Sequence, residues 1–337
     1  MKALVFLGER RLEVQELPDP VPTTGSVVLQ VLASGVCGSD VHGYQGSNGR
    51  RFPGQVMGHE AVGVVSATPD DRADLMGKVV TFTPVISCST CNACLNLQDN
   101  RCVNRKLIGV HPDINGAFAE YVLVPISNLF PWNSESVKAG TLVEPLSVAW
   151  RALSELGAEK PERVLVLGAG TIGALVAVAL KDRFRGAVDI YDPLGWKSEW
   201  LGQLDINSVS TSQNKASPFA EGSSEGAYDV VVDCVGSTNS LKSSVESVAA
   251  GGRVHIVGMA AAVVDYPLQR AVSREVVLST SYAYTRNQFA EAALSAERLE
   301  PTLLLMNPVT CTLDDAPEQI EALLEPGNRV AKLVICP

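Results

Sequence analysis

Three side chains in the N-terminal part of the chain offer ligand types that zinc prefers. Cys37 supplies a thiolate, His59 an imidazole and Glu60 a carboxylate. Three such protein ligands hold a catalytic zinc and leave one coordination position open. Zinc polarises an alcohol or carbonyl oxygen there and lowers the pKa of an alcohol, so that an alkoxide, a good hydride donor, forms near neutral pH. Glu144 is a candidate for a fourth oxygen ligand that exchanges with water or substrate.

A second cluster of candidate metal ligands follows in a loop-like stretch. Its four thiols are spaced Cys-x2-Cys-x2-Cys-x7-Cys, at Cys88, Cys91, Cys94 and Cys102. Four thiolates at this spacing can surround one zinc, and a site closed by four protein ligands orders a loop without catalysing a reaction. An iron–sulfur cluster is the competing interpretation, because cysteines three positions apart also ligate such clusters. No other feature of a redox site accompanies the cysteines, so we favour a structural zinc.

A glycine-rich turn between a strand and a helix predicts a dinucleotide site. The predicted strand 163–167 leads directly into the turn 168–173, and a second strand, 187–191, ends on Asp192. In this fingerprint the first glycine makes the tight turn, the second admits the pyrophosphate to the backbone, and the third lets helix and strand pack closely. The helix N-terminus then faces the phosphates. Asp192 accepts hydrogen bonds from the ribose hydroxyls and repels a 2′-phosphate, which favours NAD over NADP.

Further candidate contacts lie at the ends of later strands, where ligands lie along such a sheet. The full set of candidate cofactor-binding residues is Gly168, Gly170, Thr171, Ile172, Gly173, Asp192, Val235, Gly236, Val257 and Gly258.

The chain changes its secondary-structure pattern near residue 148. Short Val-rich runs bounded by turn residues predict a compact, β-barrel-like domain without a long helix in residues 1–147, with strands at 2–6, 11–15, 26–33, 61–66, 78–83 and 117–124. Residues 148–275 alternate strands with helices, as in a parallel doubly wound sheet, with further strands at 228–235 and 253–257, an edge strand at 276–281 and a helix at 240–250. The remaining residues carry a helix at 288–298 and a closing strand at 330–335, and we expect them to pack on the first domain.

Composition restricts the partners. A length of 337 residues suits two domains, and a net charge of −10 disfavours a nucleic-acid or anionic membrane surface, while small neutral substrates remain open. No apolar run approaches the roughly 20 residues of a spanning helix, and the N-terminus lacks a signal peptide's apolar region, so we expect a cytoplasmic protein. Eight cysteines without a secretory signal then indicate metal ligands and buried thiols rather than disulfides.

The order of these motifs resembles the zinc-dependent medium-chain dehydrogenase/reductase family over essentially the whole chain. The matching motifs are Cys-Gly-Ser-Asp-Val-His at 37–42, Gly-His-Glu at 58–60, the four cysteines, Glu-Pro at 144–145 and the glycine turn. The resemblance implies an α/β protein with a GroES-like β-rich catalytic domain, residues 1–147 and 276–337, and an inserted Rossmann NAD-binding domain, residues 148–275. Homodimers or homotetramers are expected from the family alone.

The resemblance also assigns roles. It places a catalytic zinc on Cys37, His59 and Glu60, with Glu144 as fourth or exchanging ligand, and a structural zinc on the four clustered cysteines. Ser39 matches the hydroxyl that takes the substrate proton. His42 matches the histidine that passes protons toward solvent, a role that suits a side chain titrating near neutral pH.

The expected activity is that of an NAD-dependent, zinc-dependent secondary-alcohol dehydrogenase. Glu60 directly after the zinc histidine, with Tyr44 nearby, resembles the polyol, sugar and threonine dehydrogenase branch, which implies a hydrophilic substrate. Sorbitol-dehydrogenase-like members place Arg-Tyr after the last Rossmann strand, whereas Ala283 stands at the Arg position here, so another sugar, a cyclitol or an amino alcohol is the alternative. A zinc-stabilised nucleotide-binding sensor without turnover and a metal-free, NADPH-dependent alkene reductase are competing functions. The intact ligands argue against both, and Asp192 argues against the reductase.

Overall fold

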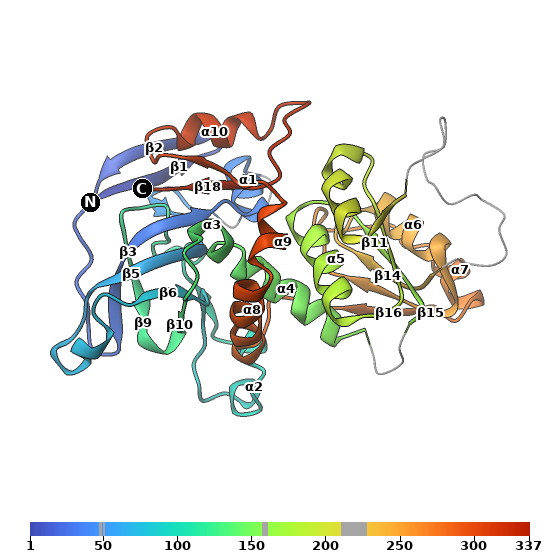
Figure 1. Ribbon diagram of the computed structural model, residues 1–337, viewed down its shortest axis with the longest axis horizontal. Coiled ribbons are helices and arrows are strands. Elements are labelled where there is room, and N and C mark those ends of the chain that lie inside the picture. Colours follow the sequence, from blue (N-terminus) through green and yellow to red (C-terminus); the bar gives the residue numbers. More distant parts are fainter. Residues whose placement is uncertain (47–48, 50, 157–160, 210–227) are drawn as a thin grey trace. The chain divides into compact units, whose positions relative to one another are not determined.

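The computed structural model describes residues 1–46, 49, 51–156, 161–209 and 228–337 (Figure 1). The chain divides into two compact units, the first formed by Met1–Ser147 and Thr285–Pro337 and the second by Val148–Tyr284. The first unit thus contains both chain ends. The boundary expected at residue 276 differs from this division, because strand β16 (Val277–Thr280) still belongs to the sheet of the second unit.

The first unit is dominated by β-structure. Its main sheet has seven strands in the order β10-β6-β5-β3-β18-β17, with β9 also pairing with β3, and two small sheets have the orders β2-β1-β4 and β7-β8. Its strands are β1 (Lys2–Gly8), β2 (Arg11–Glu16), β3 (Ser26–Gly35), β4 (Gln55–Val56), β5 (Glu60–Ala67), β6 (Val79–Phe82), β7 (Val85–Ile86), β8 (Lys106–Leu107), β9 (Tyr121–Pro125), β10 (Leu129–Pro131), β17 (Val309–Cys311) and β18 (Leu333–Ile335).

The long strand β3 organises this unit because it pairs antiparallel with β5, β9 and β18. Val27, Leu29 and Val31 alternate along β3 and belong to one buried apolar cluster with residues of β5, β6 and β9. The pairing with β18 places the C-terminal strand beside a strand from the first tenth of the chain (Figure 1). The predicted packing of the C-terminal segment on the first domain is therefore confirmed for this strand.

Short helices connect the strands of the first unit. They are α1 (Gly38–Tyr44), η1 (Asp70–Leu75), α2 (Asn92–Leu95), η2 (Asp99–Arg101), η3 (Ile126–Asn128), α3 (Val137–Gly140), α8 (Arg286–Arg298), α9 (Glu300–Leu304) and α10 (Ala316–Ala322). A longer helix, α4 (Val143–Ser154), begins in the first unit and continues into the second. The sequence pattern indicated neither α1 nor α4. Pro145 lies in the first turn of α4, where the missing N–H of proline costs no hydrogen bond.

In the part of the second unit that the structure describes, six parallel strands form a sheet in the order β13-β12-β11-β14-β15-β16. Its elements are β11 (Arg163–Leu167), α5 (Thr171–Arg183), β12 (Ala187–Tyr191), η4 (Gly195–Lys197), η5 (Glu199–Leu204), β13 (Asn207–Ser208), β14 (Tyr228–Asp233), α6 (Thr238–Ser247), β15 (Val248–Ile256), α7 (Leu268–Ser273) and β16. β11 and β12 coincide with the predicted ranges, and β16 is an edge strand, as expected.

Helices cover the faces of this parallel sheet. Leu241 and Val245 of α6 and Ala271 of α7 share a buried apolar cluster with Leu165 and Leu167 of β11. Helix α5 packs against β11 and β12, and its residues 173–180 are all buried. Among the described residues, no helix has the length and apolar character that crossing a membrane requires.

Candidate active site

Cys37 lies at the turn between β3 and α1. It is the N-cap of α1, where its sulfur accepts a hydrogen bond from the Ser39 amide at 3.4 Å. Its own amide donates to Asp40 Oδ2 at 3.1 Å, which completes a capping box. The helix start therefore fixes the sulfur, and Asp40 takes part in that arrangement.

Backbone contacts around Gly58 position His59. Gly58 has a φ of +97°, and the Gly58 carbonyl accepts a hydrogen bond from the Ala117 amide at 2.9 Å. A Cβ on Gly58 would come within 2.5 Å of the Phe118 ring, so only glycine fits before His59. This explains why Gly58 precedes the histidine in the motif.

The surroundings of His59 suit a metal ligand. Its side chain is buried, with Nδ1 at 3.7 Å from Asp40 Oδ1, and Nδ1 has no hydrogen-bond partner among the residues that the structure describes. Burial alone would lower the pKa of His59, but Asp40, Cys37 and Glu144 outweigh it and raise the pKa to about 10. These neighbours favour a positive charge at the imidazole. That charge is supplied either by a proton on the ring or by a metal ion in place of the proton.

Glu60 is the first residue of β5 and is buried beside the same cluster. One atom each of Cys37, His59 and Glu60 lies within 4.8 Å of the others, which is close enough for one metal ion. The donor set of sulfur, nitrogen and oxygen fits zinc. Glu144, half-buried in the first turn of α4, lies outside this group of ligand atoms, although its charge acts on His59.

The predicted relay residues lie on α1. Ser39 Oγ accepts a hydrogen bond from Arg51 Nη2 at 3.3 Å, and His42 is exposed one turn further along the helix. Residues three apart share a helix face. The same Arg51 nitrogen donates to Asp40 Oδ1 at 2.6 Å, in an ion pair whose two side chains are each 1% exposed. Arg51 and Asp40 were not singled out from the sequence.

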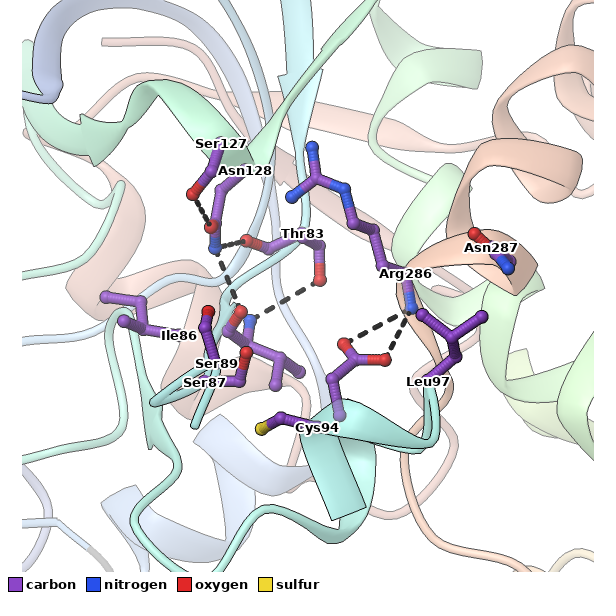
Figure 2. Close-up of a pocket in the computed structure, with 12 residues that line it drawn as sticks. Thr83, Ile86, Ser87, Ser89, Cys94, Leu97, Ser127, Asn128, Arg286 and Asn287 are labelled. Atoms are coloured by element: carbon purple, nitrogen blue, oxygen red, sulfur yellow. Dashed lines mark hydrogen bonds between the residues drawn. The ribbon is translucent and has the colours of Figure 1, made fainter. Parts of the chain in front are cut away.

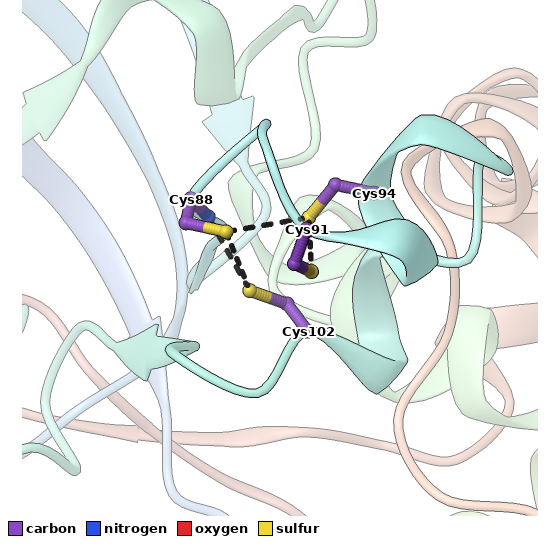
Figure 3. Close-up of side chains that lie close together, drawn as sticks. All are labelled: Cys88, Cys91, Cys94 and Cys102. Carbon is purple, nitrogen blue, oxygen red and sulfur yellow. Dashed lines mark hydrogen bonds between the residues drawn. The ribbon is translucent and has the colours of Figure 1, made fainter.

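The four clustered cysteines converge, as Figure 3 shows. The sulfurs of Cys88 and Cys102 are 3.4 Å apart, those of Cys91 and Cys94 are 3.5 Å apart, and those of Cys88 and Cys94 are 4.0 Å apart. The Thr90 backbone amide and hydroxyl lower the pKa of Cys88 to about 5, whereas burial and neighbouring cysteines raise the pKa of Cys94 to about 11. Four thiolates this close repel one another unless a cation lies between them, which fits a metal ion.

A cavity of about 230 Å³ lies beside the cysteine lobe, the loop from Cys88 to Cys102 (Figure 2). Asp99 of the lobe accepts hydrogen bonds from the Arg286 amide at 3.1 and 3.2 Å, at the start of α8. Asn128 donates to the Thr83 and Val85 carbonyls at 2.7 and 2.9 Å. These polar groups are used within the protein: Asp99 joins the lobe to the start of α8, and Asn128 of η3 holds the segment between β6 and β7.

The glycine turn of the second unit has the expected backbone. Gly168 has a φ of +91°, and a Cβ on Gly173 would overlap the Gly168 carbonyl oxygen. Gly170 caps α5 without a side chain, and no described atom would lie within 4 Å of a Cβ there. Thr171 and Ile172 begin the helix, so their amides lie at its N-terminus, the end of a helix that attracts anions.

The other candidate cofactor residues lie at the same ends of the parallel strands. Asp192 follows β12, and its carboxylate accepts hydrogen bonds from the Ala169 amide at 2.9 Å and the Leu194 amide at 2.8 Å. Val235 and Gly236 follow β14, and Val257 and Gly258 follow β15. A Cβ on Gly236 would overlap Gly258, so the two loops approach through their glycines. The buried Asp233 accepts hydrogen bonds from the Val235 and Gly236 amides, both at 2.9 Å, a contact that sequence reasoning missed.

Comparisons with known proteins agree with this architecture. Residues 23–134 match the family model of the alcohol dehydrogenase GroES-like domain, and residues 174–297 match that of zinc-binding dehydrogenases. L-idonate 5-dehydrogenase of Vitis vinifera is 31% identical over 96% of this chain and 92% of its own length. The chain belongs to the zinc-dependent alcohol dehydrogenase family.

Two further similarities lie in the polyol and sugar branch of this family. L-galactonate-5-dehydrogenase of Escherichia coli is 26% identical over 86% of each chain. The crystal structure of L-idonate 5-dehydrogenase from Escherichia coli has a TM-score of 0.87 with 24% identity and covers 100% of this chain and 98% of that one, which shows the shared fold. The predicted family, the GroES-like and Rossmann fold and the zinc and nicotinamide dinucleotide cofactors are confirmed. The protein is a zinc-dependent oxidoreductase that transfers hydride between a secondary alcohol and a nicotinamide dinucleotide.

Proposed function

We propose that this dehydrogenase acts through a zinc ion held by Cys37, His59 and Glu60. The observation that carries the proposal is the convergence of their ligand atoms within 4.8 Å, with His59 and Glu60 buried. When bound, zinc supplies Lewis-acid polarisation of the substrate oxygen. Glu144 is the proposed exchanging ligand. Its charge already acts on His59 and Lys332, which supports a place near the metal.

The proposed proton path runs along α1. Ser39 takes the proton of the substrate hydroxyl, and the exposed His42 passes it to solvent. Arg51 donates to Ser39 Oγ, so the hydroxyl oxygen is the acceptor in this contact. A hydroxyl held in this way can accept one proton while it releases another.

The proposed cofactor is NAD rather than NADP. Its pyrophosphate binds at Gly168, Gly170, Thr171, Ile172 and Gly173, at the N-terminus of α5. Asp192 receives the ribose hydroxyls; backbone amides hold its two oxygens, each of which keeps a lone pair for a further donor. Val235, Gly236, Val257 and Gly258 line the proposed path of the cofactor. The proposed structural zinc is held by Cys88, Cys91, Cys94 and Cys102.

The proposed substrate is a small hydroxylated molecule that carries a carboxylate. The names L-idonate, L-galactonate and L-threonine dehydrogenase, which relatives at 26 to 31% identity bear, support a sugar acid or a hydroxy amino acid. A polyol, neutral sugar or cyclitol is the comparison set for the assay. We further propose a cytoplasmic homodimer or homotetramer that binds neither nucleic acid nor membrane, a proposal that the net charge of −10 supports.

Metal analysis tests the assignment first. We expect two zinc ions per wild-type chain and one in Cys37→Ala, with loss of NAD reduction on a panel of sugar acids, hydroxy amino acids and polyols. Cys311→Ala, a half-buried cysteine outside both clusters, is the matched control and retains both ions. Unchanged metal content in Cys37→Ala would remove Cys37 from the zinc site.

A further inference from the structure

A buried ion pair joins the C-terminal segment to the candidate zinc site. Lys332 immediately precedes β18, and its Nζ pairs with Glu60 Oε2, each side chain being 1% exposed. The same Nζ donates to the Val36 carbonyl at 3.1 Å, one residue before Cys37. Lys332 therefore contacts both the proposed ligand Glu60 and the residue that precedes the proposed ligand Cys37.

The fold leaves space for this pair. Gly35 is the last residue of β3, which pairs with Glu60 on one side and Val334 on the other. A Cβ on Gly35 would come within 2.5 Å of Glu60 Oε2 and 2.9 Å of Lys332 Cε. A side chain on Gly35 would displace the pair, so the pair occupies the position of that missing side chain.

The charge on Lys332 is held by the site itself. Its Nζ has two acceptors, the Glu60 carboxylate and the Val36 carbonyl, although the side chain is buried. The lysine is thus a buried cation whose ion-pair partner is a proposed zinc ligand. A buried cation without such partners would be strongly unfavourable.

Lys332 and zinc attract the same carboxylate. An oxygen that accepts a hydrogen bond from an ammonium group has less negative charge to give a metal ion, and a cation near the metal repels it. Both effects weaken the bond between Glu60 and zinc. We propose that Lys332 is a positioning residue that keeps Glu60 an exchangeable zinc ligand, shared between Nζ and the metal; this rests on the proposed zinc site.

The rate of zinc release to a strong chelator tests this role. The phase that is absent in Cys37→Ala belongs to the catalytic site, and the cysteine lobe supplies a second, internal reference phase. We expect Lys332→Met to slow the catalytic-site phase by about 10- to 100-fold, the scale on which groups next to ligands change metal affinity. Lys181→Met, which removes the cation of an exposed pair with Asp205 in the second unit, leaves both phases unchanged.

The Glu60→Gln background separates sharing of the carboxylate from simple repulsion. If Lys332 acts through Glu60, most of the effect of Lys332→Met disappears when Glu60 is already Gln. An equal effect in both backgrounds, or no slowing at all, overturns the proposal.

If Lys332→Met does not fold, Lys332→Arg is the second variant. It keeps the charge, and we expect it to release zinc at a rate near that of wild type; slow release from Lys332→Arg also overturns the proposal. If Cys37→Ala keeps both phases, the zinc assignment itself fails, which is a different result.

Discussion

Buried charges at the candidate active site occur in pairs. Arg51 pairs with Asp40 and Lys332 with Glu60, and all four side chains are 1% exposed. Replacing a buried pair with apolar groups is often neutral or stabilising, so stability alone does not explain these pairs. Each pair contains a carboxylate that serves the metal site, since Asp40 faces His59 and Glu60 is itself a proposed ligand. The two cations hold these carboxylates in place.

Another buried ionisable group, His255 in β15, lies in the second unit. It is fully buried, and its ring nitrogens form hydrogen bonds with Ser279 Oγ at 2.9 Å and Ser281 Oγ at 3.0 Å. Burial, with Arg253 and Arg151, lowers the pKa of His255 to about 4. The serines thus bind a neutral imidazole.

The lowered pKa predicts a loss of stability in acid. Below the ordinary histidine pKa, the unfolded chain binds a proton that the native protein does not. The free energy of unfolding therefore falls as the pH falls from about 6.5 to about 4, by about 3 kcal/mol from this residue, and levels off below that. Denaturant unfolding of wild type and His255→Gln across this range measures the effect. Gln keeps a hydrogen-bonding side chain without titrating, so the difference between the two proteins shrinks by about 3 kcal/mol in acid. A difference that does not depend on pH would contradict the prediction.

The proposed ligand residues could be selected from the sequence because their types are distinctive and each belongs to a short motif. Their partners could not. Lys332 is 272 residues from Glu60 along the chain, and Arg51 is 11 residues from Asp40. An ordinary lysine or arginine gives no local signal of burial. Only the pairing of β3 with β5 and β18 shows that Lys332 meets Glu60.

At the scale of elements, the predictable segments were short apolar runs with clear ends. β11 and β12 are short, mostly apolar runs with polar residues or glycine at their ends, and their observed bounds are the predicted ones. α1 has seven residues and depends on the capping box of Cys37 and Asp40 rather than on an apolar stripe. A cap formed by a cysteine is outside the usual Ser, Thr, Asp and Asn signal, so the helix was missed.

The turn between β11 and α5 allows two glycine roles to be separated. Gly173→Ala places a Cβ on the Gly168 carbonyl oxygen, so we expect a loss of stability of about 1–3 kcal/mol or more from overpacking. Gly170 has a φ of −67°, and no described atom lies within 4 Å of the position that a Cβ would take, so Gly170→Ala retains the fold. If the pyrophosphate approaches the backbone there, the same Cβ blocks it.

Calorimetric titration with NAD and thermal unfolding distinguish the two variants. Gly170→Ala unfolds like wild type but binds NAD at least about tenfold more weakly, a change of about 1.4 kcal/mol. Gly173→Ala loses both stability and binding. Wild-type NAD affinity in Gly170→Ala would place the pyrophosphate elsewhere, whereas wild-type stability in Gly173→Ala would mean that the turn relaxes freely.

At the scale of the molecule, the proposed zinc site depends on both ends of the chain. β3 and β5 come from the N-terminal part, while Lys332 and β18 come from the last residues. The register of β18 against β3, with Val334 opposite Gly35, is what brings Lys332 to Glu60. The closing strand therefore contributes a charge to the proposed site as well as completing the sheet.

The sheet of the second unit ends at β16, whose outer edge predicts self-association. Val277 is 42% exposed and Leu278 is 45% exposed, so two large apolar side chains lie on an edge strand. An edge of this kind is a template for pairing with another strand, and a second copy of the same edge completes both sheets in a symmetric dimer.

Leu278→Glu tests this assembly. A charge on each copy of the edge meets its own equivalent across a twofold interface, and we expect the dimer to dissociate at least about tenfold more readily, a change of about 1.4 kcal/mol. Leu294→Glu replaces a leucine of α8 that is 70% exposed and is the matched control, which should assemble like wild type. Sedimentation equilibrium over a range of concentrations measures both. Equal association of the wild type and Leu278→Glu would remove β16 from the interface, and a monomeric wild type would mean that the edge needs no partner. Weaker association in Leu278→Glu alone would place β16 in the interface. β16 pairs directly with β15, the strand that leads to Val257 and Gly258, so the assembly would then involve the last strand of the sheet that carries the proposed cofactor residues.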